Sequence, residues 1–356
     1  MDEQLERKPS IEARLQEAVR LTAPGTTLRT ALDMMIAGEL GALITIGDEE
    51  AVLASGNDGF PLDIAFTANR LFELSKMDGA IVVNGQQTQI LRANFHLNPD
   101  PNLPTNETGM RHRTAARMSQ VTDAVVLSVS ERRRVVTVYV GGRSFRIRSI
   151  PEIMTMVSQL LVTLQTSRQE LDRALLRLTS LELENFVTLA DVTNVVFLFE
   201  VLMSAAEELD ATILELGREG RTISMRRDEL MGTMDDEYNL FIRDYALDSS
   251  PENAERIRAQ FHEMSNLKLR SPLRVAEILG HEDVHEDSVI VPLGLRTLSG
   301  VSVVREGMAE SIEDEFGSLR ALFKRIQESP EILYELGVNN PNILADSLRR
   351  MRGRSE

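Results

Sequence analysis

Residues 76–115 read KMDGAIVVNGQQTQILRANFHLNPDPNLPTNETGMRHRTA, and this stretch decides the fold of the first part of the chain. Two short apolar runs, at 80–83 and 89–93, have the length and β-branched bias of strands. Residues 94–110 then contain three prolines and no periodicity, before a helix predicted over 114–120. Structureless loops of more than about 12–15 residues are usually functional or disordered. We favour a functional loop, because basic residues follow it directly.

Outward from this stretch, helical and strand patterns alternate over residues 1–150. Helices are predicted over 11–21, over 67–77, and from a cap at Thr26 or Thr27 to Glu39. Strands are predicted over 41–46, 124–130, 135–140 and 144–148. The first 150 residues are therefore expected to form an α/β domain, with a mixed central sheet flanked by helices.

After Pro151 the pattern becomes helical, with long stretches at 152–178 and 181–208, and with further helix, interrupted by short breaks, over 221–245 and 251–279. We expect an all-α linker domain over 151–290 whose first helix forms a spine, followed by short helices in a third domain over 291–356. The most apolar stretch, 187–206, contains Asp191 and Glu200. Each acid would cost roughly 2.5–3.5 kcal/mol near a bilayer centre. A buried bundle helix is the better interpretation, and no membrane association is expected.

Composition narrows the possible functions further. The chain of 356 residues has no cysteine and five histidines, which excludes thiolate catalysis and Cys-ligated metal centres and makes a His-rich metal site unlikely to form. Lys and Arg number 39 against 55 Asp and Glu, a net charge of −16, so contact with nucleic acid requires a local basic patch. The charged N-terminal segment does not read as a signal peptide, and a cytoplasmic protein is expected.

Common nucleotide and hydrolase motifs are missing, and one polar cluster remains. No P-loop, G-x-G-x-x-G, G-x-S-x-G or H-E-x-x-H pattern occurs. Arg111, His112, Arg113 and Thr114 stand where the long loop enters a helix, whose free backbone N–H groups favour a phosphate. Gly109 allows close backbone approach. An exposed basic turn that caps a helix is the alternative.

Asp78 and Gly79 complement this phosphate site. A carboxylate near a triphosphate can hold Mg²⁺ or Mn²⁺, and the glycine leaves room for a ligand. Alone, an Asp-Gly pair is more often a turn. The combination of the two motifs, rather than either one, indicates function.

The combination closely resembles the diadenylate cyclase family. K-M-D-G-A (76–80), A-N-F-H-L-N-P-D (93–100), G-M-R-H-R-T-A (109–115) and V-V-L-S-V-S-E-R-R-R (125–134) match in order and spacing. L-E-L-E-N-F-V-T-L-A-D-V (181–192) and L-E-L-G-R-E-G-R (214–221) are similar to the linker of the members that scan DNA integrity. The tail from R-T-L-S-G-V to F-G-S-L-R-A-L-F resembles their helix-hairpin-helix domain. The resemblance covers nearly the whole chain beyond about residue 10.

This resemblance implies a cyclase that condenses two ATP into cyclic di-AMP and two pyrophosphates. One nucleotide binds per domain, and two domains of a homo-octamer face each other. Asp78 would ligate Mg²⁺ or Mn²⁺ and orient or deprotonate the attacking hydroxyl. The phosphates would be gripped by Arg111, His112, Arg113 and Thr114, with assistance from Ser130. The nucleotide-binding residues would also include Gly79, Ala80, Gly109 and Leu97, which would pack on adenine. His96 is interpreted as structural.

The resemblance also implies sequence-independent binding of DNA, with a preference for branched structures, as part of a DNA-integrity checkpoint. The second hairpin should lie at Leu336-Gly337-Val338-Asn339-Asn340, where Asn339 replaces the usual glycine and would have to tolerate a left-handed conformation. Residues 296–356 carry nine basic and ten acidic residues. Four of the basic residues cluster at Arg349, Arg350, Arg352 and Arg354, as a phosphate-contacting end or a solvated helix tip. A second basic set is expected near the triphosphates or on an assembly surface: Arg132, Arg133, Arg134, Arg143, Arg146 and Arg148.

Two alternatives to the cyclase stay open. Asp58 stands where the family usually has glycine, and an acid there would narrow the nucleotide pocket or change its charge. It supports a DNA-structure-binding protein whose cyclase domain is inactive or only senses nucleotide. A nucleotidyltransferase that uses another nucleoside triphosphate would be distinguished by competition with GTP.

Overall fold

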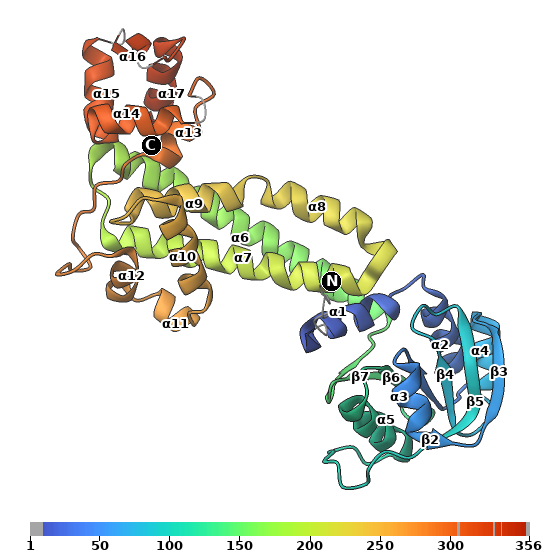
Figure 1. Cartoon of the computed structure of the whole chain (residues 1–356). Coiled ribbons are helices and arrows are strands. Elements are labelled where there is room, and N and C mark those ends of the chain that lie inside the picture. The colour runs from blue at the N-terminus through green and yellow to red at the C-terminus, as the bar shows by residue number, and fades with distance from the viewer. Residues whose placement is uncertain (1–9, 305–306, 330–331, 336, 354–356) are drawn as a thin grey trace, which may run out of the picture. The chain divides into compact units, whose positions relative to one another are not determined.

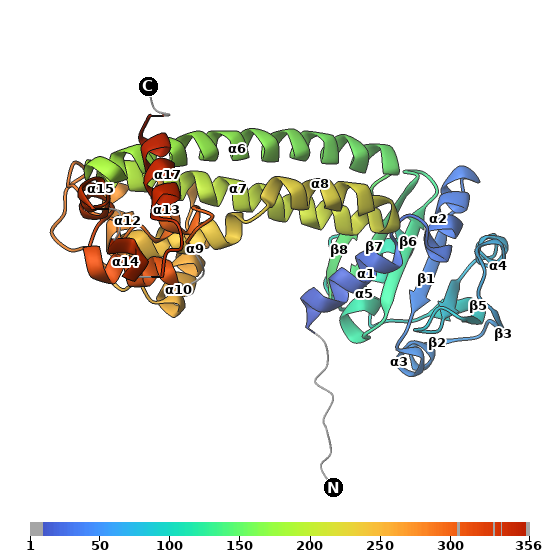
Figure 2. The same cartoon turned by 90° about the horizontal axis from the view of Figure 1, so that it is seen from above.

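The computed structural model describes residues 10–304, 307–329, 332–335 and 337–353. The chain divides into two compact units: residues 1–158 with 210–224, and residues 159–209 with 225–356. Two long helices, α6 (Ile150–Glu184) and α7 (Leu189–Leu216), contribute to both units. Figures 1 and 2 show the chain from two directions.

The first unit is built on an eight-stranded mixed sheet with strand order β2-β5-β4-β1-β6-β7-β8, and β3 also pairs with β5. Strands β1 and β4 are parallel, with Leu43 opposite Ala80, and the other pairs are antiparallel. The strands are β1 (Ala42–Ile46), β2 (Gly56–Asn57), β3 (Phe60–Ala65), β4 (Ala80–Val83), β5 (Gln89–Leu97), β6 (Val125–Ser130), β7 (Val135–Val140) and β8 (Arg143–Arg146).

Helices cover both faces of this sheet (Figure 2). Alternate residues of the central strands point to opposite faces. Ile44 and Leu127 pack with α1 (Ile11–Leu21), α2 (Thr27–Ala37) and α4 (Ala68–Leu74). Leu43 and Val126 pack with α3 (Glu49–Ala54) and α5 (Met110–Val121). Burial on both faces explains why β1 and β6 are mostly apolar, and it confirms the predicted α/β sheet.

Three differences from the predicted elements bear on the site. Strand β5 continues to Leu97, so the first residues of the predicted loop belong to the sheet. Helix α5 begins at Met110 rather than at 114, because Gly109 adopts the extended N-cap conformation. The basic residues therefore lie in the first turn of the helix. The short elements α3, β2 and β3 were not predicted, since β3 is largely exposed and begins with Phe60-Pro61.

The boundary between the two long helices also differs from the prediction. Helix α6 ends at Glu184 rather than near 178, and α7 begins at Leu189 rather than at 181. Asn185 ends α6 with a φ of 56°. Thr188 and Asp191 then form a capping box: the Thr188 Oγ1 accepts from the Asp191 N–H at 3.3 Å, and the Asp191 carboxylate accepts from the Thr188 N–H at 3.1 Å.

The second unit is helical and contains an aromatic core. The rings of Phe199 and Tyr238 stack with centroids 4.3 Å apart, and Phe241 and Tyr245 extend the cluster. One apolar segment, starting at α7, is long and apolar enough to span a membrane, but 61% of its apolar window is buried inside the structure. It is thus weak evidence for a span and fits the predicted core helix.

The remaining helices follow α7 in the order of the chain. After a 3₁₀ turn (Gly217–Gly220), Gly232 separates α8 from α9 and is one of the short breaks expected after residue 221. A separate apolar core joins α13 to α17 with Leu183 of α6. The helices are α8 (Arg221–Met231), α9 (Met234–Tyr245), α10 (Pro251–His262), α11 (Asn266–Leu269), α12 (Pro272–Leu279), α13 (Leu295–Ser299), α14 (Met308–Phe316), α15 (Leu319–Glu328), α16 (Ile332–Glu335) and α17 (Pro341–Gly353).

Candidate functional site

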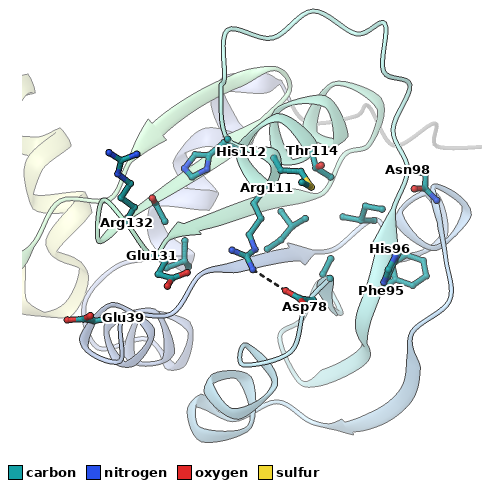
Figure 3. Close-up of a pocket in the computed structure, with 18 of the residues that line it drawn as sticks. Glu39, Asp78, Phe95, His96, Asn98, Arg111, His112, Thr114, Glu131 and Arg132 are labelled. Atoms are coloured by element: carbon teal, nitrogen blue, oxygen red, sulfur yellow. Dashed lines mark ion pairs between the residues drawn. The ribbon is translucent and has the colours of Figure 1, made fainter.

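The first unit contains a solvent-open cavity of about 1070 Å³ at one edge of the sheet (Figure 3). It lies where β1 and β4 begin, where β5 and β6 end, and beside the first turn of α5. It is large enough for a nucleotide, since ligand pockets generally measure about 300–1,000 Å³. Its lining residues are Glu39, Leu43, Asp78, Gly79, Ala80, Phe95, His96, Leu97, Asn98, Gly109, Met110, Arg111, His112, Thr114, Val129, Ser130, Glu131, Arg132 and Arg134.

Asp78 is placed by a tight turn that leads into β4. Gly79 has a φ of +84°, and a Cβ there would lie 2.7 Å from the carbonyl carbon of Asn94, so the turn requires glycine. Asn94 lies at an irregularity of β5 and donates its side-chain N–H to the Asp78 carbonyl oxygen at 2.9 Å. The backbone of Asp78 is thus fixed, while its side chain is 94% exposed. A fixed, solvated carboxylate is well suited to meet a ligand.

The first turn of α5 provides hydrogen-bond donors opposite Asp78. Gly109 supplies no side-chain cap, and the first intrahelical backbone bond found at this end runs from the Arg113 N–H to the Gly109 carbonyl at 2.9 Å. The N–H groups of Met110, Arg111 and His112 are therefore available to an anion. The helix dipole adds a partial positive charge at the same place.

Arg111 joins the two motifs across the cavity. Its Nη2 lies 3.5 Å from the Asp78 Oδ1, an ion pair drawn in Figure 3. Gly41 leaves room for it, because a Cβ there would lie 2.5 Å from the Arg111 Nη1. Two segments about 30 residues apart in sequence therefore meet at one point, as the predicted site requires. Exposed pairs of this kind contribute about 0–1 kcal/mol, so a phosphate can easily displace Asp78 from the guanidinium.

His112 lies behind this ion pair, between α5 and the sheet. Its Nδ1 is 3.2 Å from the Ser128 Oγ, and its ring meets Tyr139 edge-on with centroids 6.5 Å apart. Its Nε2 is buried and has no hydrogen-bond partner among the described residues. Burial lowers the pKa of His112, and the neighbouring arginines Arg133 and Arg111 act in the same direction.

The segment from Asn98 to Gly109 is held against α5 and β7. Arg117 donates to the Leu103 carbonyl at 3.0 Å, and Gln120 donates to that of Pro104 at 3.1 Å. The Tyr139 hydroxyl donates to Glu107 at 2.9 Å, and burial raises the pKa of this phenol, which keeps it protonated. These hydrogen bonds hold the predicted loop in place beside the N-terminus of α5.

The turn between β6 and β7 adds charged residues to the cavity. The sequence predicted only that the second basic set lies near the triphosphates or on an assembly surface. Arg132 and Arg134 of the second basic set line the cavity, whereas Arg133, Arg143, Arg146 and Arg148 do not. Arg134 pairs with Glu39 at the end of α2. Glu39 and Glu131 were not predicted, because nothing in their local sequence indicates that α2 ends beside this turn.

Most of the predicted site residues are brought together, with two differences in which residues line the cavity. The cavity is lined by Asp78, Gly79, Ala80, Leu97, Gly109, Arg111, His112, Thr114 and Ser130. Arg113 is exposed and does not line it, since it lies on a different side of α5 from Arg111 and Thr114. His96, interpreted as structural, does line it. The Ser130 Oγ accepts from the Arg133 N–H at 3.2 Å and so also shapes the turn.

The concern about Asp58 is not supported by its place in the structure. It lies between β2 and β3, is exposed, and is absent from the cavity lining. Its φ of 61° explains why glycine suits this position, and Asp is among the residues that tolerate it best.

We therefore expect Asp58→Gly to leave activity at the site within about twofold of wild type. The carboxylate neither reaches the cavity nor narrows it, so its removal changes neither charge nor shape there. Initial rates at several ATP concentrations, with Asp58→Ala as a second variant that lacks the carboxylate, check this. A gain of more than tenfold in both variants would show that the Asp58 carboxylate lowers activity at the site.

The donors of the cavity fit a divalent cation only together with phosphate. The described residues form no group of three or more Asp, Glu, His or Cys side chains placed to hold a metal. Asp78 offers one exposed carboxylate. Mg²⁺ is often bound by one or two carboxylates plus substrate phosphates and water. Asp78 thus fits a cation that arrives with a nucleotide.

The comparisons with known proteins agree with this geometry. The DNA integrity scanning protein DisA of Symbiobacterium thermophilum is 37% identical over 336 residues, which are 94% of this chain and 95% of that protein. The chain belongs to the DisA family. Two family descriptions match, "DisA bacterial checkpoint controller nucleotide-binding" over residues 29–144 and "DisA bacterial checkpoint controller linker region" over 147–288.

Two further similarities accompany this assignment. DisA of Acetivibrio thermocellus is 37% identical over 350 residues, 98% of this chain and 96% of the relative. The crystal structure of DacA from Staphylococcus aureus is 24% identical, with a TM-score of 0.30, and covers 41% of this chain and 97% of that one. The match to the Acetivibrio protein covers 98% of this chain and so includes most of the C-terminal helices, where the predicted DNA-binding residues lie.

The predicted DNA-binding residues that the structure describes lie in two places: Gly337 and Asn339 in the turn between α16 and α17, and the arginines in the last turns of α17. Gly337 has a φ of +81°, which requires glycine. Asn339 is not among the described residues with positive φ, so the left-handed conformation that we expected it to tolerate does not occur. Arg349 pairs with Asp346 at 3.2 Å, and Arg350 is exposed. Leu336, Arg354 and the side chain of Arg352 lie outside the described residues.

Proposed function

We propose that this chain is a diadenylate cyclase that condenses two ATP into cyclic di-AMP and two pyrophosphates. The observation that carries this proposal is the meeting of Asp78 and Arg111 at one nucleotide-sized cavity, beside a helix N-terminus. Asp78 supplies a carboxylate for the attacking hydroxyl, and Arg111 with the α5 N–H groups supplies donors for the attacked phosphate. The match of residues 29–144 to the DisA nucleotide-binding family supports the same reaction.

In this proposal each 3′-oxygen attacks the α-phosphorus of the other ATP. The bond between that phosphorus and the pyrophosphate oxygen breaks, and the hydroxyl proton leaves towards Asp78 or water. Arg111, His112 and Thr114 hold the phosphates, Ser130 shapes the adjoining turn, and Leu97 packs on adenine. Arg113 lies on the exposed side of α5, outside the cavity, and would support the site from there. Catalysis then depends on positioning and on electrostatic stabilisation of the developing charge.

A bound Mg²⁺ or Mn²⁺ would neutralise phosphate charge and would be held by Asp78 together with phosphate oxygens. The open cavity and the exposure of Asp78 support a second copy facing the first, because a two-fold symmetric product suits a two-fold symmetric site. We propose a cytoplasmic homo-octamer with no membrane association. Its domains would be the cyclase over 1–150, the linker over 151–290 and helix-hairpin-helix helices over 291–356.

Incubation of the full chain with ATP and either cation, followed by mass analysis for cyclic di-AMP, tests this function. We expect product with at least one cation, and little inhibition by a large excess of GTP. No product with either, from a chain that still binds DNA, would favour the alternative of a DNA-structure-binding protein that only senses nucleotide. Strong competition by GTP would favour a different nucleotidyltransferase.

We also propose that the C-terminal helices bind DNA without sequence preference, favouring branched forms, and couple this binding to synthesis as a DNA-integrity checkpoint. The name of the relatives, the glycine turn at Gly337 and the basic end of α17 support it. Arg349, Arg350 and Arg352 would contact phosphates, and the backbone from Gly337 to Asn339 would donate to them. Recognition of this kind reads backbone and shape.

Binding of a branched DNA by the full chain should weaken with salt. Arg350→Ala should reduce the slope of log K against log[salt] by about 0.9, the effect of one lost phosphate contact on duplex DNA. Lys268→Ala on α11 removes an exposed positive charge outside α17 and is the matched control. Fluorescence anisotropy across a salt series measures both slopes. Binding that does not respond to salt would contradict this interface.

A further inference from the structure

Ser128 is a buried hydroxyl residue with one hydrogen-bond partner, and this partner is His112. It lies in the middle of β6, is 0% exposed, and points to the sheet face that packs against α5. Its Oγ lies 3.2 Å from the His112 Nδ1, and it makes no other side-chain hydrogen bond within the described part of the chain. A serine in this apolar strand would cost free energy unless its hydroxyl were paired.

The direction of this hydrogen bond follows from counting donors and acceptors. If Nδ1 carried the proton and donated to Ser128, two buried groups would have no partner. The serine hydroxyl hydrogen would have no acceptor, and the lone pair of Nε2 would have no donor. If Ser128 donates to Nδ1, the serine hydrogen is paired, and Nε2 carries a proton instead of a free lone pair. One unpaired donor then remains, the N–H on Nε2. The second arrangement leaves fewer buried groups without a partner.

We propose that Ser128 is a positioning residue that holds His112 in the tautomer with its proton on Nε2, ready to donate to a phosphate oxygen of the bound nucleotide. This inference rests on the proposed function, because the bound nucleotide of that function supplies the phosphate oxygen that accepts from Nε2–H. It also assigns a role to a residue of the V-V-L-S-V-S strand other than Ser130. Ser128 does not line the cavity and acts through His112 alone.

The surroundings of His112 favour a neutral ring in the free protein. Burial lowers its pKa, and Arg133 and Arg111 oppose a further positive charge, against the opposite effect of Glu107. For a neutral imidazole the tautomer decides whether the buried nitrogen is a donor or an acceptor. Tyr139, edge-on to the ring, and Ser128 together fix its plane. The ring is therefore held with a preset donor at Nε2.

Ser128→Ala tests this role, with affinity for 3′-deoxy-ATP as the readout, because this nucleotide lacks the attacking hydroxyl and stays unreacted. We expect about twofold weaker binding, since the proton then distributes over both nitrogens and only about half of the molecules present the Nε2 donor. The control is Thr45→Val. Thr45 lies on the neighbouring strand β1, is 0% exposed, and has a buried hydroxyl without a partner. Its loss should leave affinity unchanged.

Two substitutions of His112 test the tautomer itself and do not depend on how well Ser128→Ala folds. His112→Gln places an amide N–H near the position of Nε2, whereas His112→Asn places it near that of Nδ1. We expect His112→Gln to bind 3′-deoxy-ATP more tightly than His112→Asn. In the His112→Gln background, Ser128→Ala should have no further effect, because the nitrogen that it addresses is gone.

The outcomes separate this inference from the proposed function. An equal loss from Ser128→Ala in both backgrounds, or tighter binding by His112→Asn than by His112→Gln, overturns the tautomer. Cyclic di-AMP formation by the wild type, assayed in parallel, decides the cyclase separately. The expected binding pattern without any product would support the tautomer in a nucleotide-sensing site and reject the cyclase. No nucleotide binding by the wild type would reject both.

Discussion

Asp78→Asn should reduce the rate of cyclic di-AMP formation by at least about a hundredfold, the lower end of what a positioned general base contributes. The amide has nearly the same size, but it accepts no proton at neutral pH and is a poor ligand for Mg²⁺ or Mn²⁺. Folding should be unaffected, because the side chain is 94% exposed and Asn94 holds the Asp78 backbone rather than its carboxylate. The rate of product formation by mass analysis, at saturating ATP, measures the loss.

Binding separates a catalytic loss from a damaged site. Asp78→Asn should bind 3′-deoxy-ATP in the absence of divalent cation at least as tightly as wild type, because removal of the carboxylate frees Arg111 for phosphate. Asp63→Asn is the matched control: it is an exposed acid of β3 in the same domain, and it lies outside the cavity lining. It should keep wild-type activity. Asp78→Asn with more than a tenth of the wild-type rate would remove Asp78 from the reaction.

The polar part of the site was predictable because it consists of two compact motifs. D-G-A and R-H-R-T each carry their chemistry within four residues, and the structure places them 3.5 Å apart at Asp78 and Arg111. Arg113 was predicted to share this role because it stands within the same four-residue motif, without regard to which side of a helix each residue occupies. Once α5 begins at Met110, helical geometry turns Arg113 outward. An earlier helix start was hard to recognise, because Gly109 caps the helix without a side-chain hydrogen bond.

Residues contributed by tertiary structure were not predictable in the same way. Glu39 reaches the cavity only because α2 ends beside the β6–β7 turn, and Ser128 meets His112 only because α5 packs over β6. No local pattern marks either contact. In the helical part, by contrast, the boundary between α6 and α7 had a sequence signal. Thr188 and Asp191 have the spacing of a capping box, and this signal was outweighed by the continuous apolar pattern.

A buried charge network in the second unit was also beyond sequence analysis. Arg296 of α13 is 7% exposed, and its guanidinium lies 2.9 Å from Glu182 of α6 and 3.6 Å from Glu237 of α9. Glu182 is 0% exposed and also accepts from the hydroxyls of Tyr245 and Thr297, at 2.7 and 2.8 Å. The network therefore joins α13 to two helices that precede it by more than 50 residues.

Asp244 completes the network at the start of α13. Its carboxylate accepts from the backbone N–H groups of Gly294, Leu295 and Arg296 at 2.6–3.1 Å, and so caps the helix. Burial, followed by the nearby charge of Glu182, raises the pKa of Asp244 to about 7. Three acidic groups thus surround the guanidinium of Arg296, and their burial is tolerable because that positive charge is present.

Arg296→Met should accordingly lower the free energy of unfolding of this unit by about 3–5 kcal/mol, as expected when one partner of a buried ion pair is removed and the other is left in place. Methionine fills most of the volume, so the loss reports uncompensated charge rather than a cavity. The matched control is Arg325→Met on α15, whose partner Glu328 lies at 3.7 Å with both side chains more than half exposed. That pair should contribute at most about 1 kcal/mol.

Chemical denaturation followed by circular dichroism, on full chains at equal concentration, compares the two variants with wild type. The transition midpoint should fall clearly for Arg296→Met and hardly at all for Arg325→Met. Glu182→Gln in the Arg296→Met background should recover part of the loss, because it neutralises the carboxylate that lost its partner while keeping acceptors for Tyr245 and Thr297. Equal midpoints for the two arginine variants would show that the guanidinium of Arg296 does not stabilise the junction between α13 and the preceding helices.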